Sequence, residues 1–195
     1  MRALEGIDLG QSALLMVDVQ RDFCPGGSMG IDGADGIIGP LNEAIVHFQS
    51  IGRPVFASRD WHPPETIHFK AQGGPWAVHC VRDTFGAEFY PDLAVPADAT
   101  IISKGISPDE HAYSSFDGYG PGDARLDAIL KGRGIQHLVI GGLSFVGCVR
   151  ATVLDGRELG YRVTVLKDGV KASTRGPRTH DGVVEELTGL GVDFR

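Results

Sequence analysis

The sequence predicts an α/β fold in three layers: a doubly wound, mostly parallel sheet of about six strands, with helices on both faces. Two observations lead to this prediction. Short apolar runs alternate along the chain with longer amphipathic segments of helix length, which is the pattern of repeated β-α-β units. The chain of 195 residues is 42% hydrophobic and 22% charged, a composition that can form a core without disulfides.

The predicted strands are short runs that are apolar on both faces, as buried parallel strands should be. A further, weaker run lies close to the C-terminus. The strands are expected at residues 13–19, 54–58, 100–103, 137–141, 162–166 and 191–194.

The predicted helices lie between these strands and carry amphipathic patterns. They are expected at residues 37–50, 123–131, 148–159 and 177–190. Pro177 suits the first turn of the last helix, because proline lacks only an N–H that would be unpaired there. No repeat, low-complexity tract or linker interrupts the pattern, so residues 1–195 are expected to form a single domain. The Gly/Pro-rich stretches 24–36 and 61–75 are typical of long functional loops.

The charge of the chain argues against nucleic acid and membrane partners. The formal net charge is −7, and the sequence has no long basic run. The N-terminus lacks the pattern of a signal peptide, and no stretch approaches the length of a membrane span. A cytoplasmic protein that acts on a small molecule is the expectation. Three widely spaced cysteines predict at least one free thiol.

Three chemically active side chains follow predicted strands. Asp18 lies at the end of the first strand, Lys104 follows the third, and Cys148 follows a Gly-rich turn after the fourth. In an open parallel sheet, ligands bind beyond the carboxyl ends of the strands, so these side chains are expected to share one crevice. Taken singly, each also fits a structural role: a loop-capping aspartate, a solvated lysine or a buried cysteine. Their joint placement favours catalysis.

A cysteine that opens a helix is expected to be a nucleophile. The helix dipole and a nearby lysine both favour the thiolate of Cys148. An adjacent carboxylate can accept the thiol proton and later deliver it to a leaving amine. Backbone N–H groups of the turn before Cys148 can bind a developing oxyanion. These groups together predict acyl transfer to water.

A second cluster lies in the segments RDWHPPETIHF and PWAVHCV. Asp60 and His62 are two residues apart just after a strand, so an extended backbone points both side chains the same way. His68 and His79 are candidates to complete the set. Three imidazoles and one carboxylate suit a divalent metal ion such as iron(II), manganese(II) or zinc(II). The alternative is a group of loop histidines that cap turns, and spacing alone does not choose between the two.

These segments together resemble the isochorismatase-like cysteine hydrolases, and most closely the nicotinamidase/pyrazinamidase branch. The resemblance extends in order through VDVQRDFCPGGS, SRDWHPP, GGPWAVHCVRDTFGAEFYPDL, ISKG, YSSF and GGLSFVGCVRATVLDG. A single D-x-Q or a single cysteine would say little, but the ordered series is specific.

The resemblance implies a role for each matching residue. It makes Asp18 the general acid/base, Lys104 its partner and Cys148 the nucleophile, with the backbone N–H groups of Ser144 and Cys148 as the oxyanion hole. The implied metal ligands are Asp60, His62, His68 and His79, and the implied metal holds the pyridine nitrogen of nicotinamide. Aromatic positions of the family match Phe23 and Trp76, which would sandwich the ring, and Tyr113, in a loop that would cover it.

The run before the nucleophile departs from the family pattern. Members usually show a small residue, then Thr, Asp and an aromatic residue or His before the cysteine, whereas this chain has Ser144, Phe145, Val146 and Gly147. In the family a cis peptide precedes the small residue, here Leu143–Ser144. The implied activity is hydrolysis of nicotinamide, and of pyrazinamide, through a cysteine thioester. Two alternatives remain: a related amidohydrolase for another small amide or carbamoyl compound, and a non-catalytic small-molecule binding protein.

Overall fold

The fold is built on a six-stranded sheet whose neighbouring strands all run parallel. A computed structural model describes Leu4 and residues 6–195. The strand order is β3-β2-β1-β4-β5-β6, so the chain winds outward from β1 in both directions and confirms the predicted doubly wound sheet. The strands are β1 (Ser12–Val17), β2 (Val55–Asp60), β3 (Thr100–Lys104), β4 (His137–Gly142), β5 (Arg162–Val170) and β6 (Asp193–Phe194).

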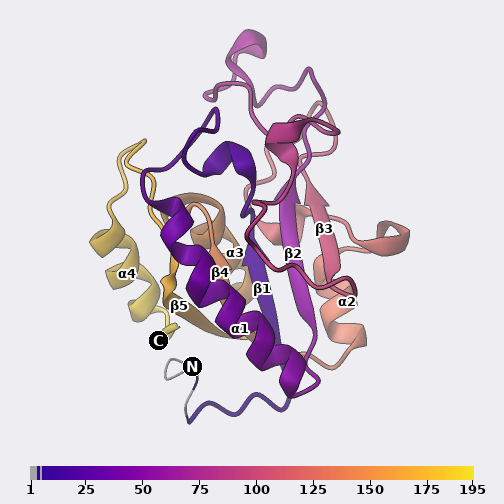
Figure 1. Ribbon diagram of the computed structural model, residues 1–195, viewed down its shortest axis with the longest axis vertical. Helices are drawn as coiled ribbons and strands as arrows, with labels where there is room; N and C mark the ends of the chain where they lie inside the picture. The colour runs from indigo at the N-terminus through magenta and orange to yellow at the C-terminus, as the bar shows by residue number, and fades with distance from the viewer. Residues whose placement is uncertain (1–3, 5) are drawn as a thin grey trace.

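Helices cover both faces of the sheet, as predicted (Figure 1). They are α1 (Ile38–Ser50), α2 (Leu126–Gly132), α3 (Arg150–Glu158) and α4 (His180–Gly189). Side chains of β1 alternate between the faces: Leu14 and Met16 belong to the apolar cluster that contains α1, whereas Leu15 and Val17 belong to the cluster that contains α2, α3 and α4. The three layers follow from this alternation.

Several element boundaries differ from the predicted ones for local reasons. β1 ends at Val17, because Asp18 adopts a left-handed backbone with φ 50°. β5 continues to Val170, with an irregular register between Ile140 and Gly142. Pro177 lies in the loop before α4 and not in its first turn, since Thr179 caps that helix by accepting a hydrogen bond from the Gly182 N–H.

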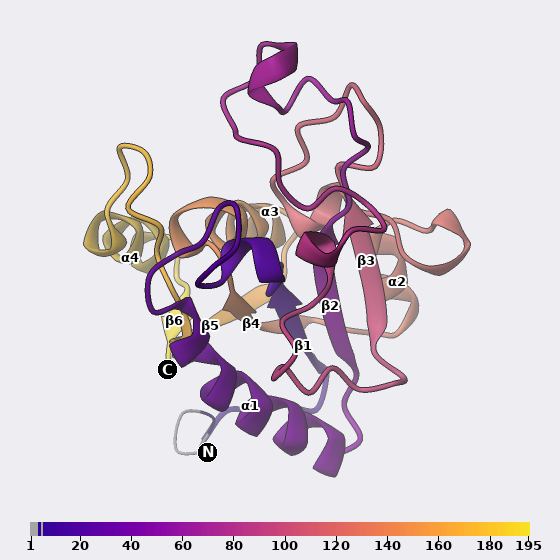
Figure 2. The ribbon, with the colours of Figure 1, turned by 45° about the horizontal axis from the view of Figure 1, so that its top comes forward.

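The long connections lie beyond the carboxyl ends of β2 and β3. Residues 61–99 and 105–125 contain only short helical turns, and part of them projects from the sheet in Figure 2. The first of these loops carries all three histidines that the sequence singled out. Within Leu4 and residues 6–195, no helix combines the length and apolarity needed to cross a membrane.

Candidate active site

Lys104 lies at the centre of the residues predicted to be catalytic. It ends β3, is fully buried, and its Nζ lies 2.9 Å from Oδ2 of Asp18. The ammonium also donates to the Cys148 Sγ at 3.6 Å, to the Ala112 carbonyl at 3.1 Å and to Oδ1 of Asp60. Asp18, Lys104 and Cys148 therefore lie together beyond the carboxyl ends of the strands, where the sequence placed them. Burial lowers the pKa of Lys104, but the Asp18 and Asp60 carboxylates outweigh burial and hold this pKa well above its usual value.

Asp18 is held at the end of β1 by its neighbour Ser58 on β2. The Asp18 N–H donates to the Ser58 carbonyl at 3.1 Å, and the Ser58 hydroxyl donates to Oδ1 of Asp18 at 2.7 Å. Burial raises the pKa of Asp18 to about 6, against the lowering effect of Lys104. A carboxyl group with this pKa is suited to accept and return a proton near neutral pH.

The buried surroundings of Cys148 favour its neutral thiol, whereas its place in the sequence suggested a thiolate. Burial raises the pKa of the Cys148 thiol well above its usual value; Lys104 opposes this, and the Asp18 and Asp60 carboxylates add to it. A carboxylate oxygen of Asp18 lies within 4.8 Å of the Cys148 sulfur. The local backbone also differs from the prediction, since Cys148 lies in a wide helical turn, Phe145–Val149, and α3 begins only at Arg150. The proton must therefore leave the thiol during attack, and Asp18 is the adjacent acceptor.

The turn before Cys148 has an unusual backbone that is held by hydrogen bonds. The Leu143–Ser144 peptide is cis. Bonds from Gly147 N–H to the Ser144 carbonyl at 2.9 Å and from Phe145 N–H to the Lys171 carbonyl at 2.8 Å hold the turn. Within the described part of the chain, the Ser144 N–H donates to no acceptor. This arrangement supports the prediction that the N–H groups of Ser144 and Cys148 bind an oxyanion.

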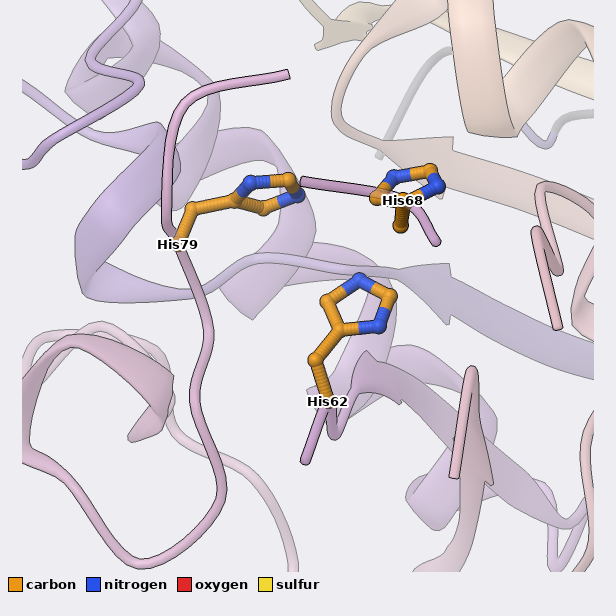
Figure 3. A group of neighbouring side chains, drawn as sticks. All are labelled: His62, His68 and His79. Atoms are coloured by element: carbon orange, nitrogen blue, oxygen red, sulfur yellow. The ribbon is translucent and has the colours of Figure 1, made fainter. Parts of the chain in front are cut away.

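The structure brings the three predicted imidazole ligands together. The available ring nitrogens of His62, His68 and His79 lie within 4.8 Å of one another, and the three rings point toward a shared space (Figure 3). Oδ2 of Asp60 lies 3.8 Å from Nε2 of His62 and 3.8 Å from Nε2 of His79. All four side chains are buried. The predicted four-residue set is thus one cluster, with the other Asp60 oxygen on Lys104.

The hydrogen bonds of this cluster suit metal ligands. Nδ1 of His62 lies 3.1 Å from the Gly105 carbonyl and Nδ1 of His79 lies 2.7 Å from the Ala77 carbonyl, so Nδ1 is the protonated nitrogen and Nε2 is a free donor to a metal. Among the described residues, Nε2 of His62 and Nδ1 of His68 are buried without a hydrogen-bond partner. Burial lowers the pKa of His62 to about 4 and of His68 to about 3. Neutral imidazoles with unpaired nitrogens and one carboxylate fit a divalent metal ion.

The residue after Lys104, Gly105, must be a glycine because of its backbone and its contact with His62. Its φ is 62°, and a Cβ at this position would collide with the imidazole ring of His62. Gln20 gives similar support to Asp60: its side chain accepts from the Asp60 N–H at 2.8 Å and donates to the Asp60 carbonyl at 2.8 Å. These positioning contacts were not predicted from the sequence.

A cavity of about 450 Å³ is lined by Cys148, His68 and His79. Phe23, Trp76 and Tyr113 all line it, and the Trp76 indole N–H donates to the Tyr113 hydroxyl at 2.9 Å. Aromatic walls beside a few polar groups are typical of sites for small aromatic molecules. A larger hollow, of about 670 Å³, lies at the opposite ends of the strands beside Gln11 and His137, away from every candidate catalytic residue.

Comparison with known proteins places this site in a family. The model of the isochorismatase domain matches residues 12–194. The chain belongs to the isochorismatase family. A nicotinamidase of Escherichia coli is 34% identical, over 92% of this chain and 92% of its own.

Solved structures of similar proteins have the same fold. A pyrazinamidase of Pyrococcus horikoshii, in complex with zinc, superposes with a TM-score of 0.86 and 43% identity, covering 95% of this chain and 98% of its own. PnC1 from L. infantum, in complex with nicotinate, has a TM-score of 0.85 and 27% identity, covering 97% of this chain and 94% of its own.

The residues before Cys148 that differ from the usual isochorismatase-family pattern have two separate structural effects. Phe145 turns away from the site and is fully buried, with its ring 5.0 Å from that of His180 and 6.2 Å from that of Phe194. Gly147 lines the cavity, and a Cβ placed there would meet only the Ser144 side chain at ordinary contact distance. The first change fills the core under α4, whereas the second leaves space beside the nucleophile.

Alkylation is expected to modify Cys148 selectively. Cys24 and Cys80 are fully buried, whereas Cys148 is partly exposed to the cavity, so only the Cys148 sulfur is accessible to a reagent. Iodoacetamide at neutral pH should therefore label one thiol in the folded protein and three in denaturant, as counted by mass spectrometry. Labelling of folded Cys148→Ala at the wild-type rate would contradict this expectation.

Proposed function

We propose that this protein hydrolyses nicotinamide to nicotinate and ammonia through a thioester on Cys148, a reaction of NAD salvage, and that it also accepts pyrazinamide. The observation that carries the proposal is the position of Lys104, which joins the thiol and the Asp18 carboxylate to the aspartate of the histidine cluster. Nicotinamidases and pyrazinamidases among the relatives support the same substrate. Residues 1–195 would act as one cytoplasmic hydrolase domain.

The first half of the reaction forms the thioester. The Cys148 sulfur attacks the carboxamide carbon while Asp18 takes the thiol proton, so a C–S bond forms and the carbonyl oxygen becomes an oxyanion. The N–H groups of Ser144 and Cys148 bind this oxyanion. Asp18 then gives its proton to the amide nitrogen, the C–N bond breaks, and ammonia leaves.

The second half of the reaction consumes water. Asp18 removes one proton from a water molecule that attacks the thioester carbon, and the C–S bond breaks to release nicotinic acid, which gives its remaining acid proton to the solvent and becomes nicotinate. The sulfur leaves as thiolate, recovers the proton from Asp18, and the resting thiol is restored. Lys104 keeps its positive charge throughout, which stabilises the carboxylate of Asp18 and the thiolate as each forms.

Asp60, His62, His68 and His79 would hold the divalent metal ion, whose identity the donor set does not select. When bound, the ion supplies a Lewis-acid site for the pyridine nitrogen of the substrate. Phe23 and Trp76 would flank the ring, and Tyr113 would cover it. These contacts present the carboxamide to the Cys148 sulfur.

The test is ammonia release from nicotinamide, pyrazinamide and an N-carbamoyl compound, by protein whose metal content has been measured. Nicotinamide should give the highest kcat/KM. Metal-loaded protein that releases no ammonia from nicotinamide would contradict the proposal, and preference for the carbamoyl compound would favour the related amidohydrolase. The space beside Gly147 is the observation that keeps this second candidate open.

The decrease of kcat/KM for nicotinamide at acid pH should follow the protonation of Asp18. Because the pKa of this carboxyl group is raised to about 6, it loses its function as a base when protonated below that pH. We expect kcat/KM for nicotinamide to fall roughly tenfold per pH unit below about pH 6. The pKa values of His62 and His68 are lower, so metal analysis at about pH 5 should still find the ion. A flat profile between about pH 5 and 8 would exclude Asp18 as the base.

Gly147 should control the size of the accepted amide. Gly147→Ala is expected to leave kcat/KM for nicotinamide within about threefold, because the added methyl group fits, while Gly147→Phe should reduce the rate for ring-substituted nicotinamides by roughly tenfold or more. Gly39→Ala, where nothing surrounds an added Cβ, serves as the matched control. Equal losses for substituted and unsubstituted amides would show that the space is not used.

A further inference from the structure

Three buried hydroxyl groups form a chain that ends on Asp18. The Thr152 hydroxyl donates to the Ser115 Oγ at 3.1 Å, the Ser115 hydroxyl donates to the Ser58 Oγ at 2.9 Å, and the Ser58 hydroxyl donates to Oδ1 of Asp18 at 2.7 Å. All four side chains are fully buried. None of the three hydroxyl groups has a role in the proposed reaction, so their alignment needs its own explanation.

The direction in which the hydroxyl groups donate their hydrogen bonds is fixed by the groups at both ends of the series. An ionised Asp18 can only accept, so Ser58 must donate to it, and Ser58 must then accept from Ser115. At the far end, the Ser115 backbone N–H donates to the Thr152 Oγ at 2.9 Å, which leaves the Thr152 proton for the Ser115 hydroxyl. Bonds that all point the same way polarise one another. The result is a preset donor aimed at one oxygen of Asp18.

The two oxygens of Asp18 are therefore unlike. Oδ1 accepts from Ser58, whereas Oδ2 accepts no hydrogen bond within the described part of the chain, although the Lys104 ammonium lies 2.9 Å from it. The Lys104 ammonium also donates to Asp60, Ala112 and Cys148. A carboxylate oxygen of Asp18 lies within 4.8 Å of the Cys148 sulfur. Because Ser58 holds Oδ1 of Asp18, Oδ2 remains available to accept the proton of the Cys148 thiol.

The chain also joins the elements that carry the base and the nucleophile. Asp18 follows β1, Ser58 lies on β2, Ser115 begins a short helical turn, and Thr152 lies in the first turn of α3, directly after the turn that contains Cys148. A rotation of the Asp18 carboxylate would break the bond to Ser58, and a shift of α3 would break the bond to Ser115. One set of bonds thus aligns both groups.

We propose that Ser58, supported by Ser115 and Thr152, is a positioning residue that holds the Asp18 carboxylate with one oxygen turned toward the Cys148 thiol. The proposal rests on the proposed function for its kinetic test. Both proton transfers of Asp18 need this orientation, so the loss of Ser58 acts on the transition states and leaves binding of the amide in the cavity unchanged.

The test compares variants that remove or keep one hydroxyl group. Ser58→Ala should lower kcat for nicotinamide by about 10- to 100-fold, the effect of one hydrogen bond to a charged group, with KM within about threefold of wild type. Ser58→Thr, which keeps the hydroxyl, should recover most of the rate. At the far end, Thr152→Val should lower kcat by a smaller factor, and Thr152→Ser should resemble wild type. If Ser58→Ala does not fold, the Thr152 pair decides.

Thr164→Val is the matched control. Thr164 is also a fully buried strand hydroxyl with one side-chain partner, since its Oγ1 lies 2.9 Å from Nε2 of His137, but it lies outside the site. It should lower the unfolding temperature without changing kcat. Metal content should stay at the wild-type level in every variant. Unchanged kcat in Ser58→Ala, or equal losses in Thr152→Val and Thr152→Ser, would overturn the proposal.

A structural measurement separates this inference from the proposed function. If wild-type protein with bound metal does not hydrolyse nicotinamide, the proposed function is wrong, whereas the hydroxyl chain is still tested by crystal structures of wild type and Ser58→Ala. We expect the Asp18 carboxylate to be rotated in the variant. An Asp18 side chain that keeps the wild-type orientation without Ser58 would overturn the positioning role.

Discussion

Cys148→Ala should abolish ammonia release from nicotinamide, with a loss in kcat of roughly 10³-fold or more. No other nucleophile occupies the position of its sulfur beside Lys104, and a thioester cannot form without it. The cavity keeps its aromatic walls and its histidines, so nicotinamide should still bind. Single-turnover assays together with calorimetric titration of nicotinamide measure the two effects separately.

Cys24→Ala is the control for this substitution. Cys24 is a fully buried thiol of the apolar cluster under α1, and its replacement should cost stability but leave kcat close to wild type. Residual activity of Cys148→Ala above about one-tenth of wild type would assign the reaction to another group. Loss of nicotinamide binding in that variant would show instead that the substitution had disturbed the cavity.

Removing Asp60 should eliminate metal and activity together. Its Oδ2 faces two imidazole nitrogens at 3.8 Å, and its Oδ1 accepts a hydrogen bond from Lys104, so Asp60→Ala removes a proposed metal ligand and also a partner of the lysine. His62→Ala removes a ligand alone. Both variants should lose the stoichiometric divalent ion, as measured by elemental analysis, and kcat should fall roughly 100-fold or more.

His47→Ala is the matched histidine control, because His47 lies on α1, outside the cluster. It should retain both the ion and the wild-type rate. Stoichiometric metal in either Asp60→Ala or His62→Ala would overturn the assigned site. Full activity in a variant that has lost its metal would show that the histidine cluster is not needed for the reaction.

The strand ends of this site were predictable because the topology of a parallel sheet brings them together. Asp18, Lys104 and Cys148 each follow an apolar run, and no knowledge of side-chain contacts is needed to place them at one edge. The histidines are different. His68 and His79 come from an irregular loop with no periodicity, so their spacing left a metal site and a set of turn caps equally open, and the family resemblance made the choice.

Other features could not be predicted because they depend on packing. The raised pKa of Cys148 follows from burial beside two carboxylates, whereas its place before a helix suggested the opposite shift. Ser58, Ser115 and Thr152 lie on three separate elements, and only the folded chain aligns their hydroxyl groups. The end of β1 at Val17 likewise reflects the left-handed backbone of Asp18, which an aspartate in a sequence does not reveal.

The carboxylate of Asp60 makes the histidine cluster and the thiol thermodynamically linked sites. It is shared between two imidazoles and Lys104, and Lys104 in turn contacts the Cys148 sulfur. A cation bound to the cluster would draw charge from one Asp60 oxygen and weaken the contact of the other oxygen with the Lys104 ammonium, so we expect occupancy of the proposed metal site to change the acidity of the Cys148 thiol. Such coupling is reciprocal: covalent capping of Cys148 must change the affinity for the ion by the same factor by which the ion changes the capping equilibrium.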